Sequence, residues 1–163
     1  MLKCLMSTRT CADCKKDRPI KEFEVLKGKW NRSICKKCRT AEQNRSRSAT
    51  PEAYLSHLCT QLKYSRNKKN PEMEWAIDPG YLIQIWDKQK GRCAISGVHM
   101  THIKDGTGVH DFNVSIDRVN PNLHYTPGNI QLVCHRINTM KHTLTEDMFY
   151  WWIKNIVTTK GEI

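Results

Sequence analysis

The sequence predicts an α+β protein in which a small cysteine-rich part precedes a larger part of mixed helix and strand. Two Cys-x-x-Cys pairs stand within the first 38 residues, and two helical apolar patterns follow them. Two short strand patterns, separated by a turn-rich loop, then lead directly into a short helix. We therefore divide the 163 residues into segments 1–48, 49–77 and 78–163, a length that suits one modest domain with a small appendage.

The first segment carries a cysteine spacing that is typical of a zinc site. Cys11 and Cys14 form one pair, Cys35 and Cys38 form the second, and 20 residues separate the pairs. Two such turns can bring four thiolates to the corners of a tetrahedron, which suits Zn²⁺ and leaves no position open for a substrate. Because so short a segment has few large apolar residues, we expect a structural zinc ribbon over residues 1–48. The alternative is four unrelated free cysteines, and Cys4 lies outside the spacing.

The positive charge of the chain is concentrated near its N-terminus. Residues 1–50 contain 14 Lys and Arg against 5 Asp and Glu, whereas the whole chain contains 27 against 16 and has a net charge of +11. A basic segment joined to a nearly neutral body favours a polyanionic partner, and a solubilising surface is the alternative. The basic residues expected to contact nucleic acid are Lys36, Lys37, Arg39, Arg45, Arg47, Lys63, Arg66, Lys68 and Lys69.

Residues 49–77 are predicted to form a basic helical linker. Thr50, Pro51 and Glu52 supply a capping hydroxyl, a proline at the first helical position and an acid in the first turn. The basic residues at the end of this helix have an alternative explanation, because cationic side chains near a helix C-terminus interact favourably with the helix dipole. A further helix is predicted from Asp78 to Gly91, and residues 39–50 are polar and basic, as in a helix end or linker.

The last segment contains a strand–loop–strand–helix pattern. Residues 112–119 and 129–134 are predicted strands, and residues 135–141 a short helix. A final helix begins at Thr145, and its apolar residues recur at helical spacing, so we expect them to form a buried stripe that closes the core. These residues are Met148, Phe149, Trp152, Ile153, Ile156 and Val157.

The stretches "SIDRVN" (115–120) and "GNIQLVCHRINTMK" (128–141) lie in this β-β-α unit. Together they resemble the HNH endonucleases, also called ββα-metal or His-Me finger nucleases, and above all their phage-type subset. The resemblance covers roughly Gly91 to Phe149, and the cysteine-rich segment is similar to zinc ribbons that accompany such nucleases. It implies a ββα-metal nuclease domain with flanking helices over residues 78–163.

The resemblance also implies roles for individual residues. Asp117 matches the carboxylate, and Asn138 the helix residue, that together bind a catalytic divalent ion. Oxygen ligands favour Mg²⁺ or Mn²⁺, which would compensate charge during phosphodiester hydrolysis. Asn129 matches an asparagine that ties the loop between the strands to the backbone, and Lys141 matches a basic residue near the phosphate. The alternative is that Asp117 and Asn138 are an ordinary strand-end residue and an ordinary helix surface residue.

Arg118 departs from the family pattern, because a histidine that takes a proton from the attacking water commonly stands at this position. Arginine stays protonated and cannot act as that base. In one interpretation Arg118 grips a phosphate oxygen, and another group or the metal ion activates the water. In the other interpretation the site binds metal and DNA without cutting. The nearby candidate bases are His110, His124, Tyr125 and His135, with His110 and His135 best placed in sequence, whereas we expect His99, His102 and His142 to be surface or loop residues.

Cys93 and Cys134 raise the question of a second zinc site. Relatives of this type carry flanking Cys-x-x-Cys pairs, but Ser96 and Ile137 occupy the partner positions here. We therefore predict two packed cysteines and no second zinc.

The function implied by the resemblance is a metal-dependent DNA endonuclease with homing-like or restriction-like activity on double-stranded DNA. It would nick one strand per site, or cut both strands as a possible homodimer. The alternatives are a catalytically inactive zinc-containing DNA-binding protein and a structure-specific junction resolvase. No apolar run is long enough to span a membrane, and thiolate zinc ligands favour a reducing compartment. We expect the cytoplasm, which is the host cytoplasm if the chain is phage-encoded.

Overall fold

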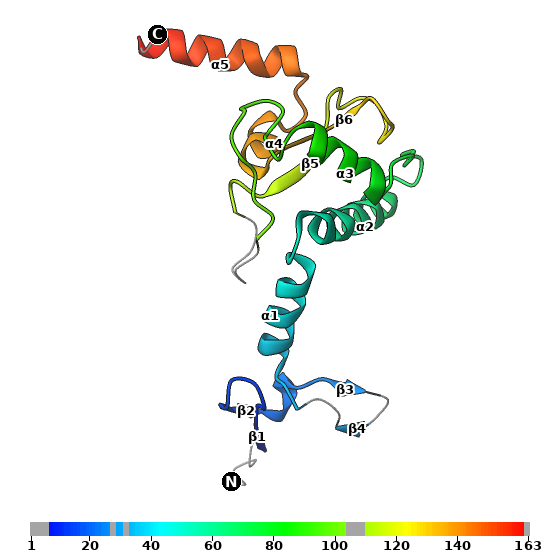
Figure 1. Cartoon of the computed structure of the whole chain (residues 1–163), viewed down its shortest axis with the longest axis vertical. Coiled ribbons are helices and arrows are strands. Elements are labelled where there is room, and N and C mark those ends of the chain that lie inside the picture. Colours follow the sequence, from blue (N-terminus) through cyan, green and yellow to red (C-terminus); the bar gives the residue numbers. More distant parts are fainter. Residues whose placement is uncertain (1–6, 27–28, 31–32, 104–109, 162–163) are drawn as a thin grey trace, which may run out of the picture. The chain divides into compact units, whose positions relative to one another are not determined.

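A computed structural model describes residues 7–26, 29–30, 33–103 and 110–161 of the chain (Figure 1). Cys4 lies outside these residues, and so do residues 104–109. The chain divides into two compact units, one formed mainly by residues 1–46 and the other by residues 47–104 and 108–163. Each unit has its own cluster of buried side chains, so each is described by itself.

The N-terminal unit consists of short strands and turns that end in a helix. Its elements are β1 (Thr8–Thr10), β2 (Asp17–Pro19), the 3-10 helix η1 (Ile20–Glu22), β3 (Val25–Leu26), β4 (Lys29–Trp30) and α1 (Lys36–Arg47). The strands form two antiparallel hairpins, β1 with β2 and β3 with β4. Within the described part of this unit, the buried side chains at the centre are Cys11, Phe23 and Cys35, which is little apolar burial.

The second unit is built from helices around one antiparallel hairpin. Its elements are α2 (Pro51–Lys69), α3 (Pro79–Lys88), β5 (Val114–Arg118), β6 (Ile130–Cys134), α4 (His135–Lys141) and α5 (Glu146–Lys160). The hairpin pairs Val114 with Cys134 and Arg118 with Ile130. The predicted order of strand, loop, strand and short helix is therefore confirmed, and with it the α+β fold class.

The helix starts follow from side-chain caps. The Thr50 hydroxyl accepts a hydrogen bond from the Ala53 N–H at 3.2 Å, and the Asp78 carboxylate accepts one from the Tyr81 N–H at 2.7 Å. A proline stands at the first turn of both α2 and α3, as the sequence predicts. We expected residues 49–77 to be a linker, but α2 places Tyr54, Leu55 and Cys59 in the core of the second unit.

The last helix differs from the sequence expectation. Phe149 is buried, and Ile153 and Val157 are half-buried. Met148, Trp152 and Ile156 are 46%, 48% and 55% exposed, so the predicted buried stripe is wrong for these three residues. Helical spacing shows only that these side chains share one side of α5, whereas burial requires a second surface against that side.

No helix within the described ranges is both long enough and apolar enough to cross a lipid bilayer.

Candidate functional site

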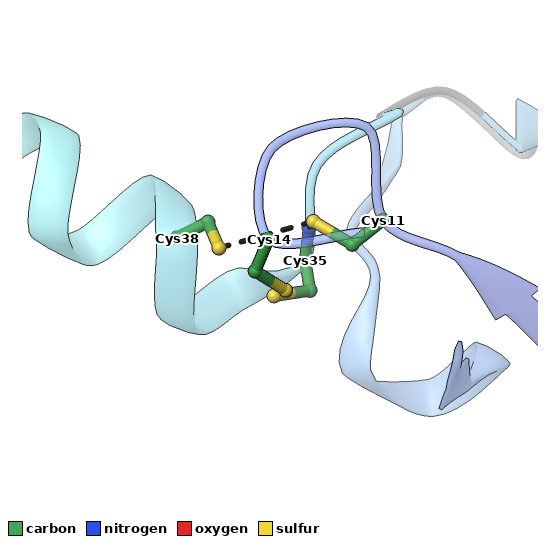
Figure 2. Close-up of side chains that lie close together, drawn as sticks. All are labelled: Cys11, Cys14, Cys35 and Cys38. Atoms are coloured by element: carbon green, nitrogen blue, oxygen red, sulfur yellow. Dashed lines mark hydrogen bonds between the residues drawn. The ribbon is translucent and has the colours of Figure 1, made fainter. Parts of the chain in front are cut away.

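The four cysteines of the predicted zinc spacing form one cluster in the N-terminal unit. The turn after β1 carries Cys11 and Cys14, and the start of α1 carries Cys35 and Cys38 (Figure 2). All four sulfur atoms lie within 4.8 Å of one another. The turn is closed by hydrogen bonds from the Cys11 N–H to the Lys16 carbonyl and from the Lys15 N–H to the Cys11 carbonyl, both 3.0 Å long.

This cluster fits a tetrahedral zinc ion. Zn–S bonds of about 2.3 Å place the sulfurs of a regular tetrahedron about 3.8 Å apart. The sulfur atoms of Cys11 and Cys38 are 3.8 Å apart. The Cys35 N–H donates to the Cys11 sulfur at 3.2 Å, and this bond is the largest of several contacts that together lower the pKa of Cys11 to about 6, which favours the thiolate. Four protein sulfurs leave no open coordination position, so the cluster suits a structural ion.

A second group of polar side chains lies where β5, β6 and α4 meet. The Asp117 carboxylate on β5 is 4% exposed and the Lys141 ammonium on α4 is fully buried. The Lys141 Nζ lies 3.2 Å from one Asp117 oxygen and 3.1 Å from the other, and it donates to the Arg118 carbonyl at 2.8 Å. The Gln131 amide nitrogen donates to Asp117 Oδ2 at 3.0 Å and to Glu146 Oε1 at 2.6 Å. The Asp117 carboxylate is thus held on both oxygens.

The surroundings of Lys141 differ from those expected from the resemblance. A basic residue near a phosphate would need an accessible ammonium group, but the Lys141 side chain is fully buried. Lys141 follows Asn138 by three residues, so both side chains lie on the face of α4 that packs against β5, and Lys141 is turned inward. In this structure Lys141 compensates the charge of Asp117.

Asn138 has an orientation that its hydrogen bonds determine. Its amide nitrogen donates to the Ser115 hydroxyl at 2.7 Å and to the Ile116 carbonyl at 3.2 Å. Both donor hydrogens are therefore directed at β5, and the carbonyl oxygen Oδ1 points elsewhere. This oxygen can serve as a ligand for a hard cation.

Two adjoining hollows bring several candidate residues together. The larger has a volume of about 380 Å³, and the smaller has a volume of about 60 Å³. Asp117 lines the smaller hollow but not the larger one. The residues that line both hollows are Arg66, Ile116, Arg118, Asn138 and His142.

Arg118 extends toward the loop between the strands. Its guanidinium donates to the Leu123 carbonyl at 2.7 Å and lies over the Tyr125 ring at 5.1 Å from the ring centre. The cation–π contact and the carbonyl hold the side chain in place. Arg118 also lines both hollows.

Asn129 ties the loop between the strands together, which is the contact that the resemblance implies. Its Oδ1 accepts the Asn120 N–H at 2.9 Å, and its amide nitrogen donates to the carbonyls of Asn120 at 3.1 Å and His124 at 2.9 Å. Asn129 is buried, so these bonds replace contacts with water.

The candidate bases differ in their relation to the hollows. His135 lines the larger hollow, but His110 is not among the lining residues of either. The His124 ring accepts the Glu74 N–H at 3.2 Å and is turned toward another loop. Tyr125 lines the smaller hollow beneath Arg118 and stacks on Trp75.

His142 is a candidate site residue that the sequence does not single out. It was expected to be a surface or loop residue, and it is exposed, but it also lines both hollows. It follows α4 with a φ of 48°, a conformation that non-glycine residues rarely adopt. The sequence carries no signal for His142, because its unusual backbone conformation is visible only in the structure.

No protein-family model matches the sequence, and no curated protein matches it. Among solved structures, the chain is similar to the rare-cutting HNH restriction endonuclease PacI. The two chains are 17% identical, the match covers 93% of this chain and 94% of that chain, and the TM-score is 0.42. A score at this level is too low to support a functional assignment, so any assignment depends on the residues of this chain.

The predicted nucleic-acid contacts are divided between the two units. In the N-terminal unit, Lys36 donates to the Lys21 carbonyl and Arg39 forms an ion pair with Glu24, so both are partly engaged. In the second unit, Lys63, Arg66, Lys68 and Lys69 are exposed near the end of α2. Arg66 is the member of this group that reaches the two hollows.

Cys93 and Cys134 are packed in the core of the second unit, as predicted. Burial raises the pKa of Cys134 to about 11, and the Ser96 N–H donates to the Cys93 sulfur at 3.4 Å. The absence of a second zinc stays a prediction.

Proposed function

We propose that this chain is a metal-dependent DNA endonuclease of the HNH type with one structural zinc site. The observation that carries this proposal is the convergence of Asp117, Arg118, Asn138 and His142 on two adjoining hollows, with Arg66 at their edge. Phosphodiester hydrolysis needs a carboxylate and a neutral oxygen for a cation, cationic groups for the phosphate, and a base for water. Each of these residue types is present there.

Asp117 and the Oδ1 atom of Asn138 would hold the divalent ion, Mg²⁺ or Mn²⁺. When bound, this ion supplies positive charge for the phosphate oxygens and for the leaving oxygen. The fit is adequate in ligand chemistry, because carboxylate and amide oxygens suit hard cations and each carboxylate oxygen has two lone pairs. Lys141 uses one direction at each Asp117 oxygen and Gln131 uses the second direction at Oδ2, so Oδ1 keeps one direction for an ion.

The protein's own residues would bind the phosphate and activate the water. Arg66 and Arg118 provide positive charge beside the phosphate. His142 takes a proton from water as the water oxygen bonds to phosphorus. The bond between phosphorus and the 3′ oxygen then breaks, the 3′ oxygen takes a proton from solvent, and the products are a 5′-phosphate and a 3′-hydroxyl. We select His142 over His110 and His135 because it lines the hollow that contains Asp117.

Double-stranded DNA is the proposed substrate, and a reducing compartment is the proposed location. The exposed basic residues of α2 lie on the same unit as the hollows, so a duplex could contact both. Thiolate ligands for zinc require reducing conditions, which the host cytoplasm provides if a phage encodes the chain.

An inactive DNA-binding protein is the second candidate, and one observation favours it. The buried Lys141 ammonium already compensates the charge of Asp117, which reduces the attraction of this carboxylate for a second cation. In this candidate, the protein binds DNA with the same basic residues and does not cleave it.

Nicking of supercoiled plasmid separates the two candidates. With Mg²⁺ or Mn²⁺, the wild-type chain is expected to convert supercoiled plasmid into nicked circles, and Asn138→Ala is expected to nick at least about 100-fold more slowly because a cation ligand is lost. The matched control is Gln61→Ala, which removes an exposed carboxamide of α2 and should nick like wild type. A wild-type chain that shifts DNA in gels but never nicks it under either ion would establish the inactive candidate.

Replacing His142 with glycine separates catalysis from folding. Glycine adopts positive φ without strain, so His142→Gly should melt at the wild-type temperature or higher. Its nicking rate should fall about 100-fold to 10,000-fold, because a general base is lost. Added imidazole should restore part of the rate. The control is His99→Ala, which changes an exposed histidine outside both hollows.

Wild-type nicking together with an unimpaired His142→Gly variant would remove His142 from the mechanism and leave the endonuclease standing. Absence of nicking in the wild type would instead overturn the proposed function itself.

A further inference from the structure

The larger of the two hollows has an apolar lining that α2 supplies. Leu58, Leu62 and Arg66 follow one another at four-residue spacing, so they form one row along the helix. Leu58 and Leu62 are half-buried and pack against the core of the second unit, whereas Arg66 is exposed. The row is thus apolar over two turns and ends in a cationic residue, which also lines the smaller hollow.

The residues of α4 that line the same hollow are polar. His135, Asn138 and Thr139 are spaced so that they share one face of α4. The Ser115 hydroxyl of β5 also lines the hollow, accepts a hydrogen bond from the Asn138 amide at 2.7 Å and has a hydrogen of its own to donate. Both α2 and α4 contact β5. The hollow therefore combines an apolar lining from α2 with hydrogen-bonding groups from α4 and β5.

Binding of a phosphate alone does not account for this lining. Phosphate oxygens are bound by cationic and hydrogen-bonding groups, to which a leucine adds nothing. The volume of about 380 Å³ is within the range of about 300–1,000 Å³ that is usual for sites of small organic molecules. A nucleotide continues from its phosphate to a base, which has apolar faces and edges that donate and accept hydrogen bonds. A base therefore matches both kinds of lining.

The base of such a nucleotide has to leave the duplex stack before it can reach the leucines. In a duplex the faces of each base are covered by its neighbours, and its pairing edge is engaged, so a protein that contacts a face first unstacks the nucleotide. The two hollows adjoin and share Arg66 and Arg118. A phosphate beside Asp117 and a base in the larger hollow can therefore belong to one short stretch of a single strand.

We propose that the larger hollow binds an unstacked nucleotide of DNA, with its base against Leu58 and Leu62 and its phosphate at Arg66 and Arg118. The inference rests on the proposed function, because it takes the smaller hollow as the place of the scissile phosphate. It narrows the substrate class to DNA in which a nucleotide at the cleavage site is unpaired or readily unpaired.

The first test compares two ligands that differ only in the base, by titration calorimetry of the full-length, zinc-loaded chain. Thymidine 5′-monophosphate should bind about tenfold more tightly than 2-deoxyribose 5-phosphate, because only the nucleotide can bury a base face on the leucines. Equal affinities for the two ligands, or binding of neither, would overturn the proposal.

Replacing Leu62 with alanine tests the apolar lining. Leu62→Ala should weaken the binding of thymidine 5′-monophosphate about fivefold and leave the binding of 2-deoxyribose 5-phosphate unchanged, which a misfolded variant would not do. The matched control is Ile83→Ala, which truncates a half-buried residue that packs against the same core but lines neither hollow. This control should bind both ligands like wild type. A Leu62→Ala variant that keeps the wild-type preference for the nucleotide would contradict the proposal.

Binding to DNA separates a site for a nucleotide within a strand from a site for a free nucleotide. A duplex with one T·T mismatch should bind about tenfold more tightly than the fully paired duplex, because a mismatched base leaves the stack at lower cost. Leu62→Ala should lose most of this preference, and Ile83→Ala should keep it. Equal binding of the two duplexes by a chain that prefers thymidine 5′-monophosphate would indicate a free-nucleotide site and overturn the assignment to DNA.

These measurements require no cleavage, so they are distinguishable from the plasmid test. Nicking by a wild-type chain that shows no preference for the base would remove the nucleotide subsite and leave the endonuclease standing. A preference for the base in a chain that never nicks would overturn the endonuclease and leave the subsite to the inactive DNA-binding candidate.

Discussion

Replacing Cys38 with alanine is expected to unfold the N-terminal unit while the second unit keeps its fold. Among the residues of that unit that the structure describes, only Cys11, Phe23 and Cys35 are buried hydrophobic residues, so little apolar burial stabilises it without a metal. Zinc binding in small cysteine sites contributes about 10–16 kcal/mol near neutral pH, which exceeds the stability of most small domains. The loss of one of four ligands should therefore release the ion and unfold residues 7–46.

Zinc content and limited proteolysis measure this outcome. The wild type should carry one zinc ion per chain, and Cys38→Ala should carry none and be cleaved rapidly before residue 47. The control is Cys59→Ala, which removes a buried thiol of the second unit and should keep the zinc ion. A Cys38→Ala chain whose N-terminal unit resists protease as well as wild type would contradict a structural metal.

Replacing Asp117 with alanine should destabilise the second unit by about 3–5 kcal/mol, independently of any catalytic role. This substitution leaves the fully buried Lys141 ammonium without its carboxylate. Lys141→Met should cost a similar amount, since it leaves the Asp117 charge uncompensated. The double variant should recover most of the loss, because neither charge then remains buried.

Chemical denaturation of the zinc-loaded chain measures these free energies, and a surface ion pair supplies the control. Asp111 and Arg136 form a pair whose side chains are 51% and 58% exposed, so Asp111→Ala should cost less than about 1 kcal/mol. If Asp117 binds the divalent ion, Mn²⁺ should raise the melting temperature of Lys141→Met more than that of wild type. A double variant no more stable than the weaker single variant would contradict the charge-pair explanation.

The elements that could be predicted from the sequence are those with local signals. The cap residues Thr50 and Asp78, each followed by a proline, mark the starts of two helices. Alternating apolar residues mark the two strands of the hairpin. The cysteine spacing identifies the cluster of four cysteines because its geometry is set within two short segments, each of which carries one Cys-x-x-Cys pair. Each of these signals depends on neighbours in the chain, so one sequence is enough to find them.

The features that could not be predicted depend on contacts between distant segments. The sequence around Lys141 does not reveal that its ammonium is buried beside Asp117, 24 residues earlier. His142 looks like any polar residue after a helix, and only its backbone conformation and the adjoining hollows distinguish it. The apolar spacing of α5 is visible in the sequence, but what covers Met148 and Trp152 is not.

The loop between β5 and β6 is held chiefly through its backbone, and this has a consequence for how the chain can diversify. The carbonyls of Asn120, Leu123 and His124 accept the anchoring hydrogen bonds from Arg118 and Asn129. Every amino acid has a carbonyl, so the loop keeps its path when its outward side chains change. Leu123 is 51% exposed and Asn122 is also exposed. Substitutions at Asn122 and Leu123 should therefore change the outer surface of the loop without changing its anchoring by Arg118 and Asn129.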